Sequence, residues 1–351
     1  MKNAQLRRQA LLLFPEFRML ALGIAFFLLS GAALAKTDEV AECLNRAAEA
    51  AHHLNYRGTL SYSGAKGEQD AQGAPRAEFL KIAHYSQEDK EYLRTETLGG
   101  SYRETIRIND VVRAYFPDLK TVRVMPSALS HVPPGVMRNN IQSDIKAILS
   151  NYTFSKAGVE RVAGRATQVI VFTPKDRYRY EQRMWVDQET GLFLAGRTME
   201  LSTQRDVERF VFADIEINVS PPEPLVIAWP ELPTDWKIEQ TGFDEKKKEK
   251  NIVSGWRASA LPPGFAKIAE EERHFTGRAQ ATTVLVYSDG LMAVSIFIER
   301  VQENATTAPT GDVSLGFLAA YTRREGDYRI TAIGKVPNDT LRLIAQGLVR
   351  K

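Results

Sequence analysis

Two hydrophobic patterns follow one another along the chain, the first with a helical period and the second with a strand period. Over residues 38–54 apolar side chains recur every three or four positions, which predicts an amphipathic helix that Thr37 or Asp38 can cap. The apolar positions are Val40, Cys43, Leu44, Ala47, Ala51 and Leu54.

Short alternating runs, typical of strands, dominate from residue 56 to about 218. They cover 56–62, 79–85, 92–97, 103–108, 111–116, 121–125, 166–173, 178–187, 192–201 and 207–217. The best-marked hairpin is 185–192, where a turn cluster separates two β-rich runs. One helix is expected near 141–149. So many antiparallel strands cannot stay flat, and the pattern predicts a barrel, a half-barrel or a sandwich.

A proline-rich segment divides the chain. Residues 219–234 contain five prolines, which break both helix and strand ladders and indicate a semi-rigid connector. We therefore expect a first domain over 36–218 and a second over 235–351. The second domain is expected to have strands near 256–258, 272–275, 281–288, 292–301 and 328–333, and helices at 313–321 and 339–349, the last capped by Asn338 or Asp339.

Residues 1–35 are typical of a secretory signal. A basic segment ending at Arg18 precedes an apolar run over 19–29, and Ala33 and Ala35 are the small residues that a signal peptidase reads. Cleavage after Ala35 is expected, with an uncleaved anchor as the alternative. Cys43 would then be the single thiol of an exported chain, either a small buried helix residue or the site of an intermolecular disulfide.

Charge and composition narrow the function classes. The chain has 46 Lys and Arg against 43 Asp and Glu, and the excess disappears without the leader, which argues against a nucleic-acid partner. One cysteine excludes an internal disulfide framework and a thiolate zinc cluster. Two S-x-x-K matches lack the companion motifs of the penicillin-recognising enzymes, and the five histidines lack ligand spacing. We therefore expect no catalytic site, no metal site and no cofactor.

Large aromatic side chains are frequent on the predicted strands of the first domain. They are core residues, or they line a lipid-sized cavity on the concave face of a half-barrel, and the pattern does not separate these two interpretations. The candidates for lipid binding are Tyr62, Phe79, Phe116, Phe172 and Trp185.

Four segments together resemble the RseB/MucB family of periplasmic regulators, and the resemblance covers essentially all of 36–351. They are the entry to the first strand at 54–60, the hairpin at 184–192, the pair 261–265 and 286–299, and the segment 330–337 before the last helix. The block 286–299 is quite specific, whereas carriers of the LolA kind share the hairpin. Lys335 is a departure, because an acidic residue is expected there.

The resemblance implies a fold and a function. The fold is α+β and β-rich, with a large LolA-like curved antiparallel half-barrel domain with packed helices, plus a smaller α+β C-terminal domain. The function is negative regulation of an envelope-stress sigma factor. The chain would bind the periplasmic part of an RseA/MucA-type membrane anti-sigma factor and shield it from site-1 proteolysis until lipid or lipopolysaccharide releases it. The alternative is a periplasmic lipid or lipoprotein carrier of the LolA type.

The partner surface can be narrowed only to a region. If block 286–299 supplies an exposed edge strand, a peptide could extend the sheet by strand addition, with Val286, Tyr287 and Phe297 as contact candidates. A cleft between two domains that a connector holds at limited angles could order a disordered peptide. An oligomer of identical chains, and acyl chains as ligands, are further expectations.

Overall fold

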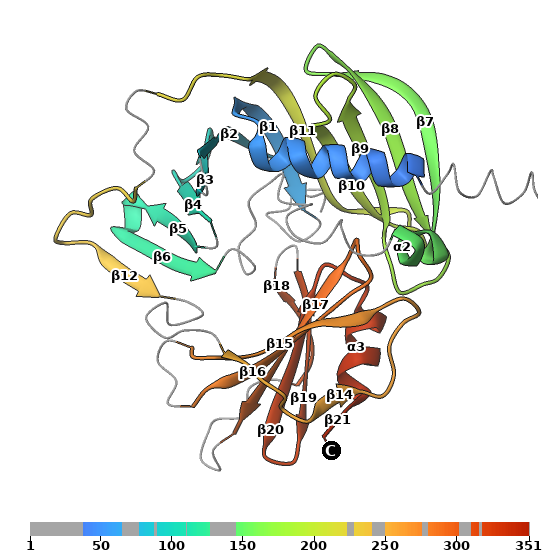
Figure 1. The fold of residues 1–351 in the computed structure, drawn as a ribbon. Helices are drawn as coiled ribbons and strands as arrows, with labels where there is room; N and C mark the ends of the chain where they lie inside the picture. Colours follow the sequence, from blue (N-terminus) through green and yellow to red (C-terminus); the bar gives the residue numbers. More distant parts are fainter. Residues whose placement is uncertain are drawn as a thin grey trace, which may run out of the picture. The chain divides into compact units, whose positions relative to one another are not determined.

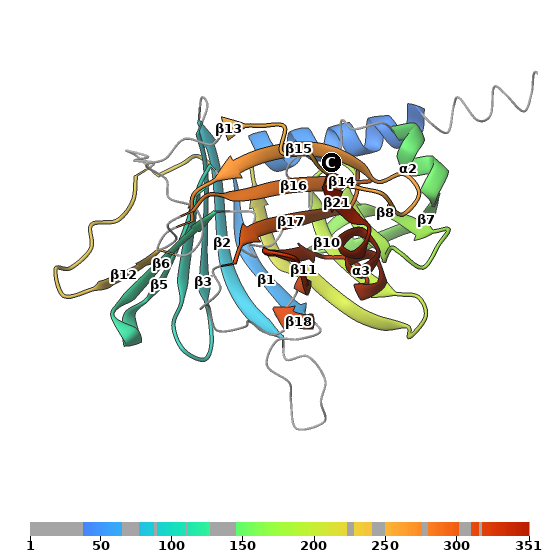
Figure 2. The ribbon, with the colours of Figure 1, turned by 90° about the horizontal axis from the view of Figure 1, so that it is seen from below.

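A computed structural model describes residues 38–64, 77–87, 90–109, 111–126, 145–222, 228–240, 250–275, 280–301, 310–315 and 318–350. The leader, its expected cleavage site and Thr37 lie outside these residues. Residues 45–351 cluster into one compact unit. Its described strands form a twelve-stranded sheet, a seven-stranded sheet and a two-stranded ribbon, and the two larger sheets are curved and open (Figures 1 and 2).

The first half of the large sheet is an antiparallel meander that follows the predicted strands closely. A helix occupies 38–53, in agreement with the helical pattern. After it come β1 (Tyr56–Gly64), β2 (Glu78–Gln87), β3 (Lys90–Thr97), β4 (Glu104–Ile108), β5 (Val111–Phe116), the short 3-10 helix η1 (Pro117–Leu119) and β6 (Thr121–Pro126). Each strand from β1 to β5 pairs with the next one in the chain.

The second half of the large sheet includes one strand that the sequence analysis missed. Helix α2 (Ile145–Asn151) is followed by β7 (Tyr152–Val162), β8 (Arg165–Pro174), β9 (Glu181–Asp187), β10 (Phe193–Glu200) and β11 (Arg205–Ile217), and β11 returns to pair with β1. The missed strand is β7. Its alternation is interrupted by a bulge between Lys156 and Val159, and its middle residues are exposed, so the strand period is lost there.

The end of the proline-rich segment packs on the large sheet. Trp229, Leu232 and Trp236 lie against a cluster that includes Tyr115 and Val122. Strand β12 (Lys237–Gln240) then pairs in parallel with β6 and extends the large sheet. The sequence analysis assigned residues 237–240 to the second domain, whereas their backbone hydrogen bonds belong to the first sheet.

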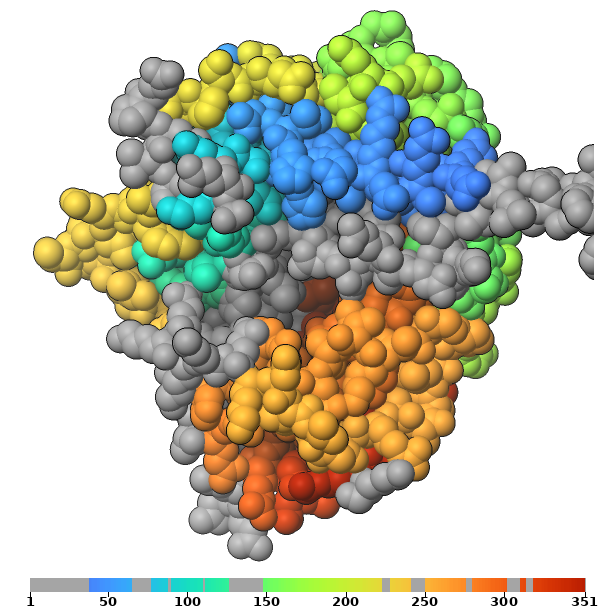
Figure 3. Space-filling model, viewed as in Figure 1, coloured from blue at the N-terminus to red at the C-terminus, as the bar shows by residue number. Residues whose placement is uncertain are grey.

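The smaller sheet contains β13 (Lys250–Asn251), β15 (Ala266–Arg273), β16 (Thr282–Ser288), β17 (Ala293–Arg300), β18 (Gly311–Leu315), β19 (Leu318–Glu325) and β20 (Tyr328–Gly334). Strand β14 (Trp256–Ala258) pairs with β21 (Leu348–Arg350), which follows helix α3 (Asn338–Gln346). No residue of β15 is fully buried, and this strand forms part of the surface shown in Figure 3.

Two helix expectations in this domain need correction. The helix expected at 313–321 is wrong, because β18 extends to Leu315, β19 begins at Leu318, and β19 pairs along its length with β20. Leu and Ala are good helix formers, but the ladder with β20 outweighs local propensity. The last helix is present, but its N-cap is Pro337, without a side-chain hydrogen bond, rather than Asn338 or Asp339.

The core of the smaller domain lies between its sheet and α3. Leu285, Ile296 and Ile330 from the sheet are fully or nearly fully buried, and so are Leu341 and Ile344 from α3. The apolar residues of α3 lie on one stripe, so burying that stripe stabilises the helix against the sheet.

Candidate functional site

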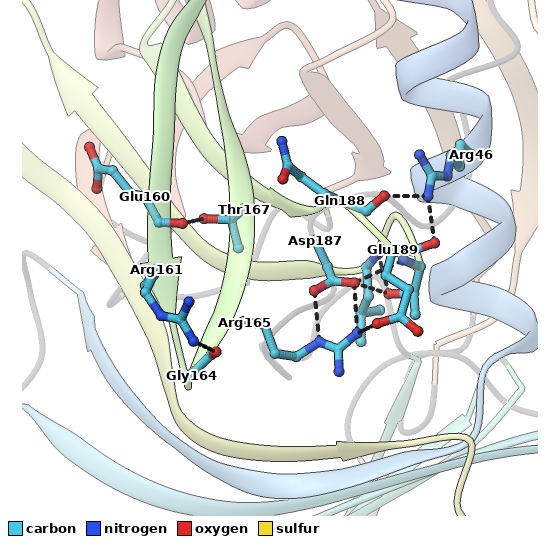
Figure 4. Close-up of polar contacts among 11 residues, drawn as sticks. Arg46, Glu160, Arg161, Gly164, Arg165, Thr167, Asp187, Gln188 and Glu189 are labelled. Atoms are coloured by element: carbon cyan, nitrogen blue, oxygen red, sulfur yellow. Dashed lines mark hydrogen bonds and ion pairs between the residues drawn. The ribbon is translucent and has the colours of Figure 1, made fainter.

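The hairpin between β9 and β10 is built around a buried carboxylate, Asp187 (Figure 4). Arg165 donates two hydrogen bonds to it, from Nε at 2.7 Å and from Nη2 at 3.0 Å. The backbone N–H and hydroxyl of Thr190 donate two more, at 2.8 and 2.9 Å. Burial alone raises the pKa of the Asp187 carboxyl, but these hydrogen bonds outweigh burial and hold the pKa below its usual range.

The same hairpin is tied to the N-terminal helix. Arg46 donates to the carbonyl oxygens of Gln188 and Glu189, at 2.7 and 2.5 Å (Figure 4). Gly191 has a φ of +85°, and a Cβ at this position would lie only 2.8 Å from Cγ of Arg46. The turn therefore requires glycine for its conformation and for the close approach of Arg46. The predicted hairpin is confirmed, and its tight turn serves as an anchor for the helix.

One face of the large sheet, which we call the helix face, receives the second half of that helix. His84 on β2 is buried there, with Nδ1 2.7 Å from the carbonyl oxygen of Leu54 and Nε2 3.1 Å from Glu91. Tyr56 stacks on the His84 ring and meets Phe212 edge to face. The first domain therefore has a packed core along this face.

The strand register divides the five lipid-binding candidates between two faces. Residues directly opposite each other in neighbouring strands project to the same side of a sheet. The pairs Tyr62–Phe210, Phe210–Gly196, Gly196–Met184 and Met184–Ile170 trace one face across five strands, and Phe172 lies two residues beyond Ile170. Following the register from β2 through β3 and β4 to β5 places Phe116 on the same face.

The other two candidates project from the opposite face. Phe79 pairs with Ser61, next to Tyr62 in the chain, and Trp185 pairs with Val169, next to Ile170. The structure thus brings Tyr62, Phe116 and Phe172 to the helix face and does not bring the five together.

The surroundings of these aromatic residues also differ. Phe172 is 0% exposed and packs against Phe154 and Tyr152, with ring centroids 5.2 and 6.3 Å away. Phe79 is 52% exposed. The indole N–H of Trp185 donates to Glu160 at 2.8 Å, and the guanidinium of Arg123 lies 4.8 Å from the Phe116 ring. Phe172 is a core residue, whereas Phe79 meets solvent.

Tyr62 lies beside the carboxylate of Glu208. Burial, reinforced by that carboxylate, raises the pKa of the Tyr62 hydroxyl far above its usual value, so the hydroxyl keeps its proton. Glu208 is itself almost completely buried on β11 and forms an ion pair with Lys335, which follows β20. Lys335, the departure noted in the sequence, therefore has a specific partner in the large sheet.

The three partner-binding candidates are also split by register. Tyr287 pairs with Val294 on the side that packs against α3, and its hydroxyl accepts a hydrogen bond from the Ala258 backbone at 3.1 Å. Val286 and Phe297 project from the other side, where Phe297 meets Phe275. Tyr287 is thus a core residue, and the other two share a face.

The expectation that a peptide adds as a strand to block 286–299 is wrong. Strands β16 and β17, which contain that block, lie in the middle of the sheet: β16 pairs with β15 and β17, and β17 pairs with β16 and β20. Their backbone donors and acceptors are already used by neighbouring strands, so no peptide strand can be added there.

The sequence analysis missed a buried ion pair that joins the two domains. Arg179, in the segment between β8 and β9, donates from Nε to Asp289 at 2.6 Å, and both side chains are 0% exposed. Tyr152 donates to the same Asp289 oxygen at 3.0 Å, and Arg179 also bonds to Asp176 and to the Pro263 carbonyl. No local sequence motif predicts this pair, because the two residues are 110 positions apart in the chain.

A groove of about 450 Å³ lies within the same region. It is lined by Arg177, Tyr180, Glu200, Ser202, Arg205, Asp206, Val207, Leu318, Ala319, Gly334, Lys335, Val336, Pro337, Asn338 and Asp339. These residues come from β10, β11 and the segment before β9 on one side, and from β19, β20 and α3 on the other. Acidic and basic side chains are mixed, which is suited to polar contacts with a peptide rather than to one kind of ion.

Within the described ranges, no three His, Cys, Asp or Glu side chains are grouped as metal ligands. None of the helices in that part of the chain has the length and apolar character needed to cross a bilayer.

Comparisons with known proteins agree over both domains. The model of the MucB/RseB N-terminal domain matches residues 39–236, and that of the MucB/RseB C-terminal domain matches residues 250–349. The sigma-E factor regulatory protein RseB of Haemophilus influenzae is 26% identical over 335 residues, which are 94% of this chain and 96% of that protein. The sigma factor AlgU regulatory protein MucB of Pseudomonas aeruginosa is 26% identical over 314 residues, 88% and 90% of the two chains.

A solved structure shares the fold. The structure of the Pseudomonas aeruginosa MucA/MucB complex contains a chain that superposes with a TM-score of 0.60 at 23% identity, covering 89% of this chain and 99% of that one. The two family models together account for nearly all of the described residues. The chain therefore belongs to the MucB/RseB family.

Proposed function

We propose that this protein is a periplasmic negative regulator of an envelope-stress sigma factor and acts by binding the periplasmic part of a membrane anti-sigma factor. The observation that carries the proposal is the family match over both domains, at 39–236 and 250–349. Curated relatives are named regulators of sigma-E and of AlgU, and MucB has been solved with the periplasmic part of MucA. A carrier of the LolA type would need only the large domain, which favours the regulator over that alternative.

The finer mechanism is protection of the anti-sigma factor from site-1 proteolysis, with release by lipid or lipopolysaccharide. Protection requires that the bound segment be ordered on a large surface, because folding a disordered segment costs binding energy. Of the lipid-binding candidates, Tyr62 and Phe116 remain on the helix face, since Phe172 is packed in the core. Acyl chains would act as effectors only if they prefer the partner-free conformation.

We place the partner contacts of the smaller domain on the sheet face opposite α3. Val286 on β16 and Phe297 on β17 project from that face, and Val286 is half-buried. Apolar side chains on a sheet face can serve as anchors for a peptide.

The test uses the mature chain and a fluorescent peptide that spans the periplasmic segment of a MucA-type anti-sigma factor. Fluorescence anisotropy reports affinity, and cleavage by the site-1 protease reports protection. We expect binding, and slower cleavage at saturating protein. Val286→Asp is expected to weaken both, while Val349→Asp, an exposed apolar position on β21, is the matched control and leaves them unchanged.

Two results would contradict the proposal in different ways. Absence of peptide binding by the folded wild-type chain would refute the proposed regulatory function. Binding with unchanged cleavage would remove only the shielding mechanism. Release by lipid is measured in the same assay, by adding lipid A or a lipoprotein-derived acyl peptide to the preformed complex.

A further inference from the structure

Three ion pairs connect the large domain to the smaller one within the described residues: Arg177–Asp339, Arg179–Asp289 and Glu208–Lys335. The Arg177–Asp339 pair is exposed on both sides, and the other two differ in their exposure to solvent. The Arg179–Asp289 pair is 0% exposed on both sides. In the Glu208–Lys335 pair, the Glu208 side chain is 4% exposed, but the Lys335 side chain is 20% exposed. Separating a fully buried pair leaves a charge that water does not reach, whereas solvent already reaches the Lys335 side chain. We therefore expect the Glu208–Lys335 pair to separate more readily than the Arg179–Asp289 pair.

The Arg179–Asp289 connection is saturated with hydrogen bonds. One carboxylate oxygen of Asp289 accepts hydrogen bonds from Arg179 and Tyr152. The other oxygen accepts hydrogen bonds from the backbone N–H groups of Leu291 and Met292, at 3.0 and 2.8 Å. The ring of Phe265 lies 5.2 Å from the guanidinium. Separation of this pair would leave a charge unpaired in the interior.

Neighbouring residues hold the same segment in place. Thr340 on α3 donates to the Tyr178 carbonyl at 2.6 Å, and Tyr180 packs against the core of the smaller domain. The segment 178–180 thus keeps its contacts with the smaller domain through three consecutive residues, as a fixed connection requires.

The Glu208–Lys335 connection has the opposite character. Its cation is one lysine ammonium group, which is a strongly hydrated point charge on a flexible stem. Lys335 lines the 450 Å³ groove, so solvent already reaches its side chain. Glu208 also lies beside Tyr62, a residue of the helix face. The Glu208 carboxylate therefore lies next to Tyr62 of the large sheet and also forms the ion pair with Lys335 of the smaller domain.

We propose that the Arg179–Asp289 pair is a pivot and that the Glu208–Lys335 pair is a latch which holds the groove closed. Release of the latch lets the smaller domain turn about segment 178–180 and widens the groove. A change in the contacts of Tyr62 alters Glu208 and, through Glu208, the latch. Ligand binding on the helix face and opening of the groove are therefore coupled. The consequence for the anti-sigma factor rests on the proposed function, whereas the opening itself does not.

The opening is measured on the full mature chain without any partner. Spin labels are attached at Ser202→Cys and Gln346→Cys, two exposed positions, in a background where Cys43 is replaced by alanine. Pulsed electron paramagnetic resonance then gives the distribution of distances between them. We expect a single narrow distribution in the parent chain.

Variants of the latch should change this distribution. Lys335→Glu places a second carboxylate beside Glu208 and should lengthen and broaden it, and Lys335→Met should do so to a smaller extent. The charge exchange Lys335→Glu with Glu208→Lys should restore the narrow distribution. Arg205→Glu, a charge reversal at an exposed position of the same groove that forms none of these three pairs, is the matched control and should have no effect.

The outcomes separate the latch from the proposed function. If Lys335→Glu and Lys335→Met both fold, as judged by circular dichroism, and both keep the parent distribution, the latch is wrong. If they open the groove, the affinity for the anti-sigma peptide should fall about fivefold or more, the lower end of typical coupling between sites. An open groove with unchanged affinity would keep the latch but refute its role in partner binding.

Discussion

Arg179 and Asp289 meet in the interior with 2.6 Å between Nε and Oδ2, although they are 110 residues apart in the chain. Burial lowers the pKa of the Arg179 guanidinium, but the Asp289 carboxylate outweighs burial and raises it, so the arginine stays charged. Burial together with the Asp289 charge also raises the pKa of the Tyr152 hydroxyl, which keeps the proton that it donates to Asp289.

Loss of one member of this pair should be severe. Arg179→Met leaves Asp289 buried beside an apolar side chain, and breaking a buried ion pair in this way costs about 3–5 kcal/mol of unfolding free energy. Denaturation by urea measures the change. Arg57→Met, which breaks the solvent-exposed Arg57–Glu216 pair, is the matched control and should have a much smaller effect. Equal losses in the two variants would show that burial does not determine the strength of the pair.

Asp187 should make stability depend on pH in the acid range. Its folded pKa is lower than the ordinary value of 3.8, so its contribution is fully present above that value and is lost as the pH falls through the folded pKa. Asp187→Asn should be less stable than the parent at pH 7, and the difference should shrink below about pH 4. Unfolding free energies at a series of pH values test this, with the exposed Asp214→Asn as control. A difference that is independent of pH would contradict it.

The aromatic candidates should respond to truncation according to their burial. Phe172→Ala removes a ring that is 0% exposed and packed between two others, and should cost about 3–5 kcal/mol. Phe79→Ala removes a ring that is 52% exposed and should change the unfolding free energy little. Thermal and chemical denaturation compare the two variants. A small loss for Phe172→Ala would indicate an adaptable cavity instead of packed core.

Gly264 should not tolerate a side chain. Its φ is +78°, and a Cβ would lie 2.0 Å from Nδ2 of Asn151, which belongs to the large domain. Gly264→Ala therefore combines backbone strain with a clash. At Gly326, where φ is +54° and no atom lies within 4 Å of the added Cβ, alanine introduces strain alone, of about 1–2 kcal/mol.

The comparison of melting temperatures of the Gly264→Ala and Gly326→Ala variants separates the two effects. The larger loss is expected for Gly264→Ala, and Asn151→Ala in the same chain should recover part of it. If the two glycine variants lose the same stability, the contact with Asn151 contributes nothing.

Local pattern was sufficient for most elements of this protein. The helix at 38–53, ten of the strands of the large sheet and the hairpin at Asp187 follow from the period of the apolar residues and from turn residues, because these signals act over a few positions. Where the period is interrupted, as in β7, or where helix-forming residues lie in a strand, as in β19, the local signal is missing or misleading.

The sequence by itself determined the class of the protein, through a family pattern spread over both domains, and the positions of its buried strands. Only the tertiary structure decided which side chains share a face, because a strand's facing depends on register with neighbours far away in the chain. For that reason Phe79 and Trp185 separate from Tyr62, and Tyr287 separates from Val286. The pairs Arg179–Asp289 and Glu208–Lys335 likewise depend on long-range packing, which no local spacing encodes.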